Sequence, residues 1–178
     1  MRVITGSARG RKLFGPKSDL IRPAIDKVKQ AVFNILGDVS GLRVLDLFAG
    51  TGSMGIEALS RDADHCTFVD QLPEAIQLIR KNLEMCQFLD QSKIIKAGVQ
   101  NFEPLQTYNL IFVDPPYDKD LVNPTLQRLA NQKLLAAEGT IVVEHSPREV
   151  IHALPDLQVY DERKYGQTLI SFLKGNPV

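Results

Sequence analysis

The sequence of 178 residues has no tryptophan, only two cysteines and no long hydrophobic run. Apolar stretches such as residues 110–113 and 141–143 fall far short of the roughly 20 residues that span a bilayer, so we expect no membrane-spanning helix. Cys66 and Cys86 have no metal-ligand spacing to a histidine, which predicts two reduced thiols and no metal site. The opening residues lack the apolar core of a signal peptide, so a cytoplasmic protein is expected.

The formal net charge of zero conceals an uneven distribution along the chain. Residues 1–30 contain eight basic and two acidic side chains, so they carry +6 and the remaining 148 residues carry −6. A basic segment of this kind is typical of proteins that bind a polyanion. A solvated basic face without a partner would show the same pattern.

The chain begins with an irregular segment and continues with alternating strands and helices. Residues 3–5 and 11–14 predict two short strands around a turn that contains glycine. Apolar residues at helical spacing predict a helix that starts at Pro23 and stops at Gly37, with Lys29 on its polar face. Further strands are expected at 44–48, 66–69, 93–96, 110–113 and 140–144, further helices at 55–60, 73–86 and around 124–130, and a closing antiparallel hairpin at 158–164 and 168–173.

This alternation predicts an α/β fold of the Rossmann-like kind, with a mostly parallel seven-stranded sheet and helices on both faces. The expected domain spans residues 38–178, and residues 1–37 form a small basic extension of hairpin and helix. In such sheets ligands bind at the carboxyl ends of the strands. The residues that follow each strand are therefore the candidates for function.

A glycine-rich turn follows the first predicted strand of the domain. Gly50, Gly52 and Gly55 form the pattern G-x-G-x-x-G between a strand and a helix, the context in which this motif binds a nucleotide. Asp46 ends the strand, where a carboxylate would repel a pyrophosphate and attract the ammonium and sulfonium groups of S-adenosylmethionine. The turn therefore favours S-adenosylmethionine over NAD, and a side chain at Gly52 is expected to intrude on its methionine moiety. The predicted cofactor contacts here are Asp46, Phe48, Ala49, Gly50, Thr51, Gly52, Ser53 and Gly55.

Asp70 ends the next predicted strand. A carboxylate at that position can accept hydrogen bonds from both ribose hydroxyls of a nucleotide cofactor. It is equally suited to cap the helix that begins at Pro73, although the glycine turn upstream favours the ribose role. Gln71 and Val99, which also follow predicted strands, are included as cofactor contacts.

A second motif follows the strand at residues 110–113. Asp114, Pro115, Pro116 and Tyr117 form a turn whose backbone the two prolines make rigid. An amino group that is to be methylated needs two acceptors that draw its hydrogens out of the ring plane, and the Asp114 carboxylate and a carbonyl near Pro115 provide them. Tyr117 offers a flat face on which a base can stack. A turn in which the aspartate only caps a helix is the alternative, and the position after a core strand disfavours it.

Together these residues resemble the RsmD-type family of small-subunit rRNA guanine-N2 methyltransferases. The resemblance covers nearly the whole chain, and its most selective part is the helix that begins with Arg22 and Pro23. It implies a class I S-adenosylmethionine methyltransferase fold and a monomer that methylates one guanine N2 amine of 16S rRNA in the small subunit or an assembly intermediate. Many relatives carry a polar or acidic residue after the third strand that can contact the adenine of the cofactor. This chain has Ala97, Gly98, Val99 and Gln100 there, so we expect backbone groups or Gln100 to make the adenine contacts.

Recognition of RNA is expected to involve the basic segment and the end of the chain. A base inside a helix is out of reach, so the guanine must be flipped out or unpaired. Basic side chains would hold the phosphates through contacts that depend on salt and not on sequence. The predicted RNA-binding residues are Arg9, Arg11, Lys12, Arg22, Lys164 and Tyr165.

Three alternatives remain open at this level. An amino-methyltransferase acting on adenine N6 or guanine N2 of DNA or tRNA uses the same two motifs, but a DNA enzyme normally carries a recognition domain for which this chain has no room. An NAD-dependent oxidoreductase would leave residues 114–117 without a role. A catalytically silent RNA-binding module could share the fold.

Overall fold

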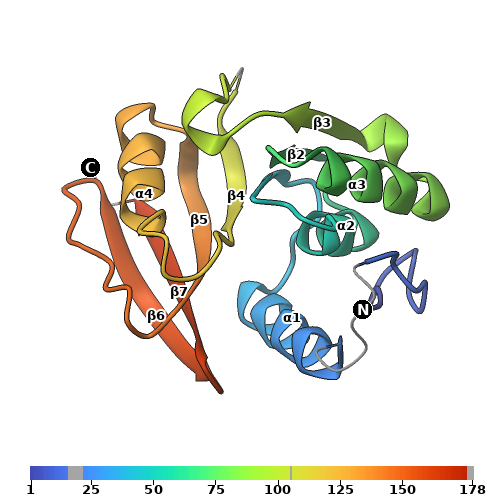
Figure 1. Ribbon diagram of the computed structural model, residues 1–178, viewed down its shortest axis with the longest axis horizontal. Coiled ribbons are helices and arrows are strands. Elements are labelled where there is room, and N and C mark those ends of the chain that lie inside the picture. Colours follow the sequence, from blue (N-terminus) through green and yellow to red (C-terminus); the bar gives the residue numbers. More distant parts are fainter. Residues whose placement is uncertain (16–21, 105, 176–178) are drawn as a thin grey trace.

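The computed structural model describes residues 1–15, 22–104 and 106–175 (Figure 1). Within them, seven strands form one sheet in the order β3-β2-β1-β4-β5-β7-β6. The strands are β1 (Arg43–Leu47), β2 (His65–Asp70), β3 (Ser92–Lys96), β4 (Tyr108–Val113), β5 (Leu135–His145), β6 (Leu157–Tyr165) and β7 (Thr168–Gly175). The helices are α1 (Arg22–Leu36), α2 (Ser53–Ser60), α3 (Pro73–Cys86) and α4 (Val122–Asn131), with short 3-10 turns at η1 (Leu89–Gln91) and η2 (Val99–Asn101).

Strands β1 to β5 run parallel, and β7 lies antiparallel between β5 and β6. This confirms the predicted Rossmann-like fold, including the closing hairpin. Among the described residues, none of the helices has both the length and the apolar character needed to cross a membrane.

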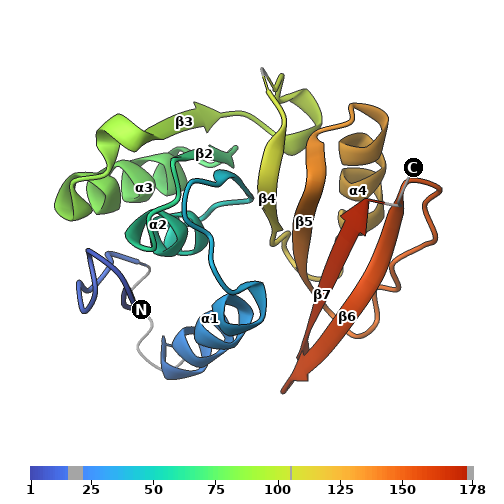
Figure 2. The same ribbon diagram turned by 180° about the vertical axis from the view of Figure 1, so that it is seen from behind.

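Helices cover both faces of the sheet (Figures 1 and 2). Successive residues of a strand point to opposite faces, so Val44 packs into the layer with α1, α2 and α3, whereas Leu45 packs into the layer with α4 and η2. Within α3 the buried residues Ala75, Ile79 and Leu83 recur every four positions, which places one face of the helix on the sheet. The two apolar layers leave the ends of the strands free to carry polar side chains.

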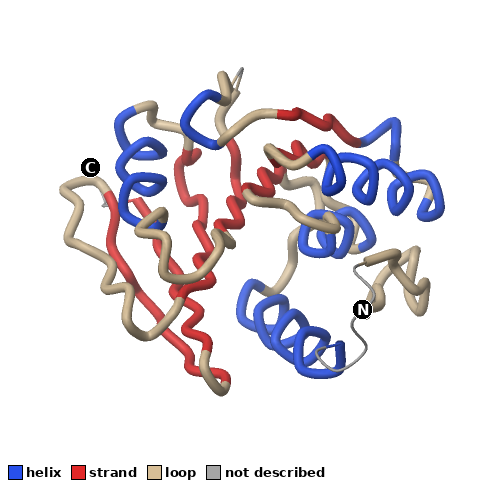
Figure 3. Tube along the Cα trace, viewed as in Figure 1, coloured by secondary structure: helices blue, strands red, loops and turns tan. Residues whose placement is uncertain are grey.

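The N-terminal segment does not form the two predicted strands. Arg2 and Lys12 make one isolated antiparallel bridge, and the chain around them is loop (Figure 3). The backbone groups of the segment pair with one another only in part, as the Val3 amide does with the Arg11 carbonyl and the Gly10 amide with the Val3 carbonyl, because other amides of the segment bind α2. Glu57 accepts the amides of Ile4 and Thr5 at 2.7 and 3.1 Å.

Further contacts hold this segment against the C-terminal end of α2. The Ser60 hydroxyl accepts the Ala8 amide at 2.9 Å, and the Ser60 carbonyl accepts the Ser7 amide at 2.8 Å. At Gly6, whose φ is +84°, a Cβ atom would lie 1.5 Å from the Ser60 carbonyl oxygen. Only glycine permits this close approach.

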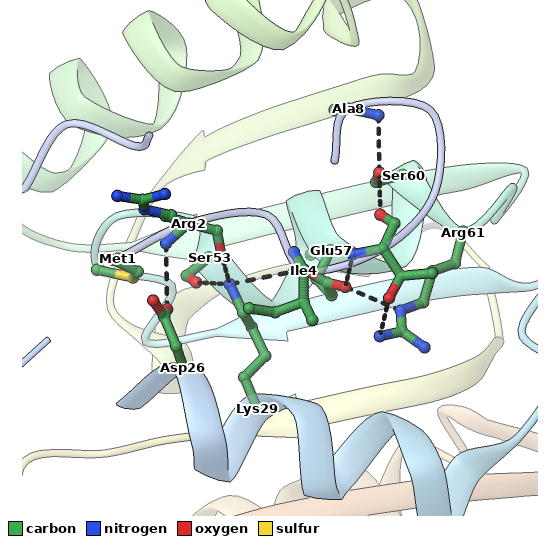
Figure 4. Close-up of polar contacts among 12 residues, drawn as sticks. Met1, Arg2, Ile4, Ala8, Asp26, Lys29, Ser53, Glu57, Ser60 and Arg61 are labelled. Atoms are coloured by element: carbon green, nitrogen blue, oxygen red, sulfur yellow. Dashed lines mark hydrogen bonds and ion pairs between the residues drawn. The ribbon is translucent and has the colours of Figure 1, made fainter. Parts of the chain in front are cut away.

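Lys29 was predicted on the polar face of α1, and this was wrong. Its side chain is buried, and its ammonium donates to the Arg2 carbonyl oxygen and to Ser53 Oγ at 2.5 and 2.9 Å (Figure 4). The same ammonium lies 3.6 Å from a Glu57 carboxylate oxygen. The N-terminal segment covers this side of α1, so Lys29 is buried although its place in the helical pattern predicts an exposed side chain.

Candidate active site

Two cavities lie at the carboxyl ends of the parallel strands. Cavity A, of about 420 Å³, is bounded by residues 70–72, 97–99 and 114–117. Cavity B, of about 560 Å³, lies between α1, the glycine turn and the tip of the β6–β7 hairpin. The residues that line both are Phe48, Asp114, Tyr117 and Glu144. The glycine turn and the turn at residues 114–117 therefore meet at one edge of the sheet, at a junction that these four residues define.

The glycine turn is braced by two acidic side chains. Asp70 Oδ2 accepts the Gly50 amide at 2.9 Å, and Asp46 Oδ2 accepts the Gly55 amide at 3.0 Å. Phe48 adopts a φ of 58°, a left-handed conformation that is uncommon for a residue with a bulky side chain. Of the predicted cofactor contacts in this turn, those that line cavity B are Asp46, Phe48, Ala49, Gly50, Thr51 and Ser53.

Gly52 and Gly55 do not line either cavity. A Cβ atom at Gly52 would face Phe68 and Ile56 at 3.3 and 3.4 Å, and one at Gly55 would lie 2.4 Å from Phe68. The expectation that a side chain at Gly52 reaches the methionine moiety is therefore wrong. Glycine at 52 is required by its φ of +77° and by packing, and glycine at 55 lets α2 contact β2.

Asp46 is a buried acid at the edge of cavity B. Its burial raises the pKa of the carboxyl to about 7, the hydrogen bond from Gly55 opposes this effect, and the charge of Asp70 adds to it. Lys29 lines the same cavity, but its ammonium already contacts Glu57 and Ser53. A cationic group in cavity B would thus stabilise the ionised form of Asp46, whereas a pyrophosphate would oppose it.

Asp70 lines cavity A and does not cap α3. The N-cap of that helix is Leu72, and no side chain caps it. Asp70 Oδ1 instead accepts the Leu72 amide at 2.9 Å, while Oδ2 accepts Gly50. Two carboxylate oxygens offer about four acceptor positions, so both can also accept a hydroxyl from the cavity. Gln71 and Val99, the other two expected cofactor contacts, line cavity A beside it.

The side chain of Asp114 opens onto the junction of the two cavities. Its backbone amide donates to the Leu47 carbonyl oxygen at 3.4 Å, whereas its carboxylate has no hydrogen-bond partner among the described residues. Desolvation raises the pKa of this carboxyl well above its usual range, and the charges of Glu144 and Asp46 add to the effect. Pro115 and Pro116 follow it and line cavity A. The carboxylate is thus an unused acceptor that faces the junction.

Tyr117 is fixed by its hydroxyl. The hydroxyl donates to Glu144 Oε1 at 2.8 Å and lies 2.7 Å from Thr168 Oγ1. The side chain remains 39% exposed, so a planar group can reach the ring. Burial of the hydroxyl raises the pKa of Tyr117, which therefore stays protonated at neutral pH.

Glu144 was not among the predicted site residues. It follows the buried residues Ile141, Val142 and Val143 near the end of β5, as Asp46 lies near the end of β1. The rule that polar residues at the carboxyl ends of parallel strands form the site, applied to β5, would have identified it. Burial raises the pKa of Glu144, and the hydrogen bond from Tyr117 lowers it.

The basic residues of the N-terminal segment do not all face solvent in the same way. Arg9 and Lys12 are exposed, whereas the Arg11 guanidinium donates to the Met85 carbonyl oxygen near the end of α3. Arg11 therefore attaches the segment to the domain. The side chain of Arg22 lies outside the described part of the structure.

The tip of the β6–β7 hairpin borders cavity B. Tyr165 and Gln167 line the cavity, and Lys164 is exposed on β6 next to them. No cluster of histidine, cysteine and acidic side chains that could hold a metal ion occurs in the described ranges. The site is therefore built from carboxylates, one tyrosine and backbone groups around two joined cavities.

The strand order, the antiparallel β7 and the acidic residues at the carboxyl ends of β1, β2 and β4 define the class I S-adenosylmethionine methyltransferase fold. Residues 1–174 match the family described as "Conserved hypothetical protein 95". The chain belongs to this family, and the RsmD-type relationship is confirmed by its relatives.

Two relatives and one solved structure illustrate the likeness. The "Ribosomal RNA small subunit methyltransferase D" of Escherichia coli (strain K12) is 33% identical, over 94% of this chain and 86% of its own. The protein YlbH of Bacillus subtilis (strain 168) is 35% identical, over 98% of each chain. The structure of yhhF from Escherichia coli superimposes with a TM-score of 0.88 at 28% identity, over 100% of this chain and 99% of that chain.

Proposed function

We propose that this protein transfers a methyl group from S-adenosylmethionine to the N2 amine of a guanine in small-subunit rRNA. The observation that carries the proposal is the junction, where an acceptor carboxylate and an exposed aromatic ring meet both the nucleotide-sized cavity A and the acid-lined cavity B. The name of the Escherichia coli relative supports rRNA of the small subunit as the substrate.

The residues of the two cavities fit the two ends of the cofactor. Asp70 in cavity A would accept the ribose hydroxyls, with Val99 beside the adenine. Asp46 in cavity B would oppose the ammonium group, with Gly50 next to the methionine backbone. When bound, S-adenosylmethionine supplies a methyl group that a neutral amine can attack. A buried acid with a pKa raised by desolvation suits a cation and not a phosphate.

The turn at residues 114–117 would position the guanine. The Asp114 carboxylate and the Pro115 carbonyl accept the two hydrogens of the N2 amine, which turns the nitrogen lone pair toward the methyl group. Tyr117 stacks on the ring, a contact worth about 1–3 kcal/mol in other proteins that bind bases. Since the methyl donor is already activated, alignment and fixed electrostatics provide most of the rate. The amine proton leaves to Asp114 Oδ or to water once the methyl group has been transferred.

The RNA would lie across the face that carries the N-terminal segment and the hairpin tip. Arg9, Lys12 and Lys164 are exposed and can contact phosphates. In this proposal residues 1–37 act as an RNA-binding extension of the methyltransferase domain at 38–178. The substrate is 16S rRNA in the small subunit or in an assembly intermediate, because a folded particle can present one guanine unpaired.

The test is methyl transfer from labelled S-adenosylmethionine to three substrates: undermethylated small subunits, free 16S rRNA and tRNA. The modified nucleosides are then identified and mapped by mass spectrometry. N2-methylguanosine at one position of 16S rRNA is the expected product. Label in N6-methyladenosine, or only in tRNA, would reject the proposal.

A further inference from the structure

Glu144 is the one carboxylate of the junction to which the proposed reaction gives no task. It lines both cavities together with Asp114 and Tyr117. Its Oε1 accepts the Tyr117 hydroxyl, and among the described residues nothing donates to Oε2. A carboxylate oxygen that can accept a hydrogen bond is therefore available beside the place where the base would lie.

Glu144 and Asp114 are close enough for their charges to interact. The charge of Glu144 is the second cause, after desolvation, of the raised pKa of Asp114. Two carboxylates that share one recess repel each other, and this repulsion is relieved when a ligand donates hydrogen bonds to both. The pair therefore favours a ligand that presents several adjacent N–H groups.

The Watson–Crick edge of guanine presents such a set of donors. Its N2 amine and its N1–H are neighbours on the same edge, so an amine held by Asp114 leaves N1–H directed at the adjacent carboxylate. Adenine carries its amine next to an unprotonated N1, and cytosine next to an unprotonated N3. In both cases a lone pair would face the second carboxylate and be repelled.

We propose that Glu144 determines the specificity for guanine by accepting a hydrogen bond from N1–H while Asp114 holds the N2 amine. This inference rests on the proposed guanine-N2 function and adds the residue that selects the base. Tyr117 and Thr168 orient the carboxylate, since the Tyr117 hydroxyl bridges Glu144 Oε1 and Thr168 Oγ1. Oε2 is then the atom that contacts the base.

The test compares guanine with 2-aminopurine, which keeps the 2-amino group but has no hydrogen on N1. Once the methylated position is mapped, small subunits are reconstituted with 16S rRNA that carries either base there, introduced by ligation of a synthetic RNA segment. The ratio of kcat/KM for guanine to that for 2-aminopurine is measured for the wild type, Glu144→Gln and Tyr117→Phe. Loss of the 6-oxygen in 2-aminopurine affects every enzyme form alike, so a change in this ratio isolates residue 144.

The wild type is expected to prefer guanine by roughly 10- to 100-fold, the range for one hydrogen bond to a charged group. Glu144→Gln should lower this ratio by about 10-fold or more. Its amide oxygen can still accept the Tyr117 hydroxyl, so its amide nitrogen faces the base. That nitrogen is a donor, which is opposed by N1–H of guanine but is accepted by the N1 lone pair of 2-aminopurine. Tyr117→Phe keeps the ring and the Glu144 carboxylate but removes the hydrogen bond that orients this carboxylate, so it should lose part of the preference and clearly less than Glu144→Gln. A loss in Tyr117→Phe as large as in Glu144→Gln would reduce Glu144 to a support for Tyr117 and overturn the inference.

Equal ratios in the wild type and Glu144→Gln would also overturn it. If turnover of Glu144→Gln is too slow, the affinities of the same two particles are compared in the presence of S-adenosylhomocysteine, and the same shift of preference is required. A wild type that forms no N2-methylguanosine contradicts the proposed function itself. A wild type that forms it, with ratios that do not depend on residue 144, contradicts only this inference.

Discussion

The ammonium of Lys29 lies 3.6 Å from a carboxylate oxygen of Glu57, and both side chains are at most 1% exposed. Glu57 also accepts two backbone amides of the N-terminal segment and the Nε–H of Arg61. Lys29 also donates to Ser53, the first residue of α2 (Figure 4). This pair therefore connects the N-terminal segment, α1 and the glycine turn, although it touches neither the Asp114 turn nor the hairpin.

Replacing Lys29 with methionine should destabilise the protein by about 3 kcal/mol, since removing one partner of a buried pair leaves the other charge uncompensated. The value lies at the lower end of the usual range because Arg61 still contacts Glu57. Denaturant unfolding measures the loss, and the exposed Lys27 of the same helix, changed to methionine, is the matched control with an effect within about 0.5 kcal/mol. Equal stability of the two variants would refute a structural role for the pair.

The sequence was sufficient to predict the order of strands and helices after residue 42, because the burial of alternating or helically spaced residues leaves a direct pattern. Helix α3 was predicted with its observed bounds, Pro73–Cys86. Strand β5 starts at Leu135, five residues before the prediction, since its first part is largely unburied and its pairing with β4 is irregular there. A strand segment that pairs through backbone hydrogen bonds but is not buried has no hydrophobic pattern from which it could be predicted.

The acidic residues of the site were predictable, because one rule about the carboxyl ends of strands identifies them. Side chains whose surroundings depend on contacts between distant segments were not predictable. Asp46, Asp70 and Asp114 were found from their places after strands, and they line the two joined cavities. The burial of Lys29 depends on a segment 24 or more residues away in the chain, as its bond to Arg2 illustrates, and helical spacing contains no information on that. The anchoring of Arg11 on the Met85 carbonyl is of the same kind.

The stability of the cofactor-free protein should fall as the pH rises from about 4 to 7, because of Asp46. Its pKa is 3.8 as a free side chain and about 7 when folded, so between these values the folded state binds the proton that the unfolded state has released. The full effect is about 4 kcal/mol above pH 7. Denaturant unfolding from pH 4.5 to 8 should show a steeper decline for the wild type than for Asp46→Asn, whose amide oxygen still accepts the Gly55 amide.

Asp114 and Glu144 contribute to the slope in both proteins, so the difference between them reports on Asp46. Parallel curves would contradict the raised pKa of this carboxyl. With S-adenosylmethionine present, wild-type binding should strengthen as Asp46 ionises between pH 6 and 8, and Asp46→Asn should lose this dependence.

Reversing the charge of Arg9 and Lys12 together should weaken binding to small subunits. Each lost phosphate contact reduces the slope of log affinity against log salt by roughly 1, so a reduction of about 2 is expected when both residues contact RNA. Lys133 is an exposed lysine that follows the end of α4, and this helix lies on the other side of the molecule from the N-terminal segment (Figures 1 and 2). Lys133→Glu therefore provides the control. A slope as steep as that of the control would remove these two residues from the RNA-binding face.

Substitutions at Asp114 separate its role as an acceptor from its role as a charge. Asp114→Ala removes the acceptor and should lower kcat by about 10²–10³, the usual cost of losing one group that is preorganised for the transition state. Asp114→Asn keeps an oxygen that can accept an amine hydrogen, so it should retain more activity than the alanine variant. Both should bind S-adenosylmethionine about as tightly as the wild type, because in the proposed arrangement Asp114 holds the base and not the cofactor. Calorimetry measures the binding, and single-turnover transfer to small subunits measures the rate. Alanine and asparagine variants with equal rates would show that the acceptor oxygen is not used, and a parallel loss of cofactor binding would place Asp114 in the cofactor site and not in the base site.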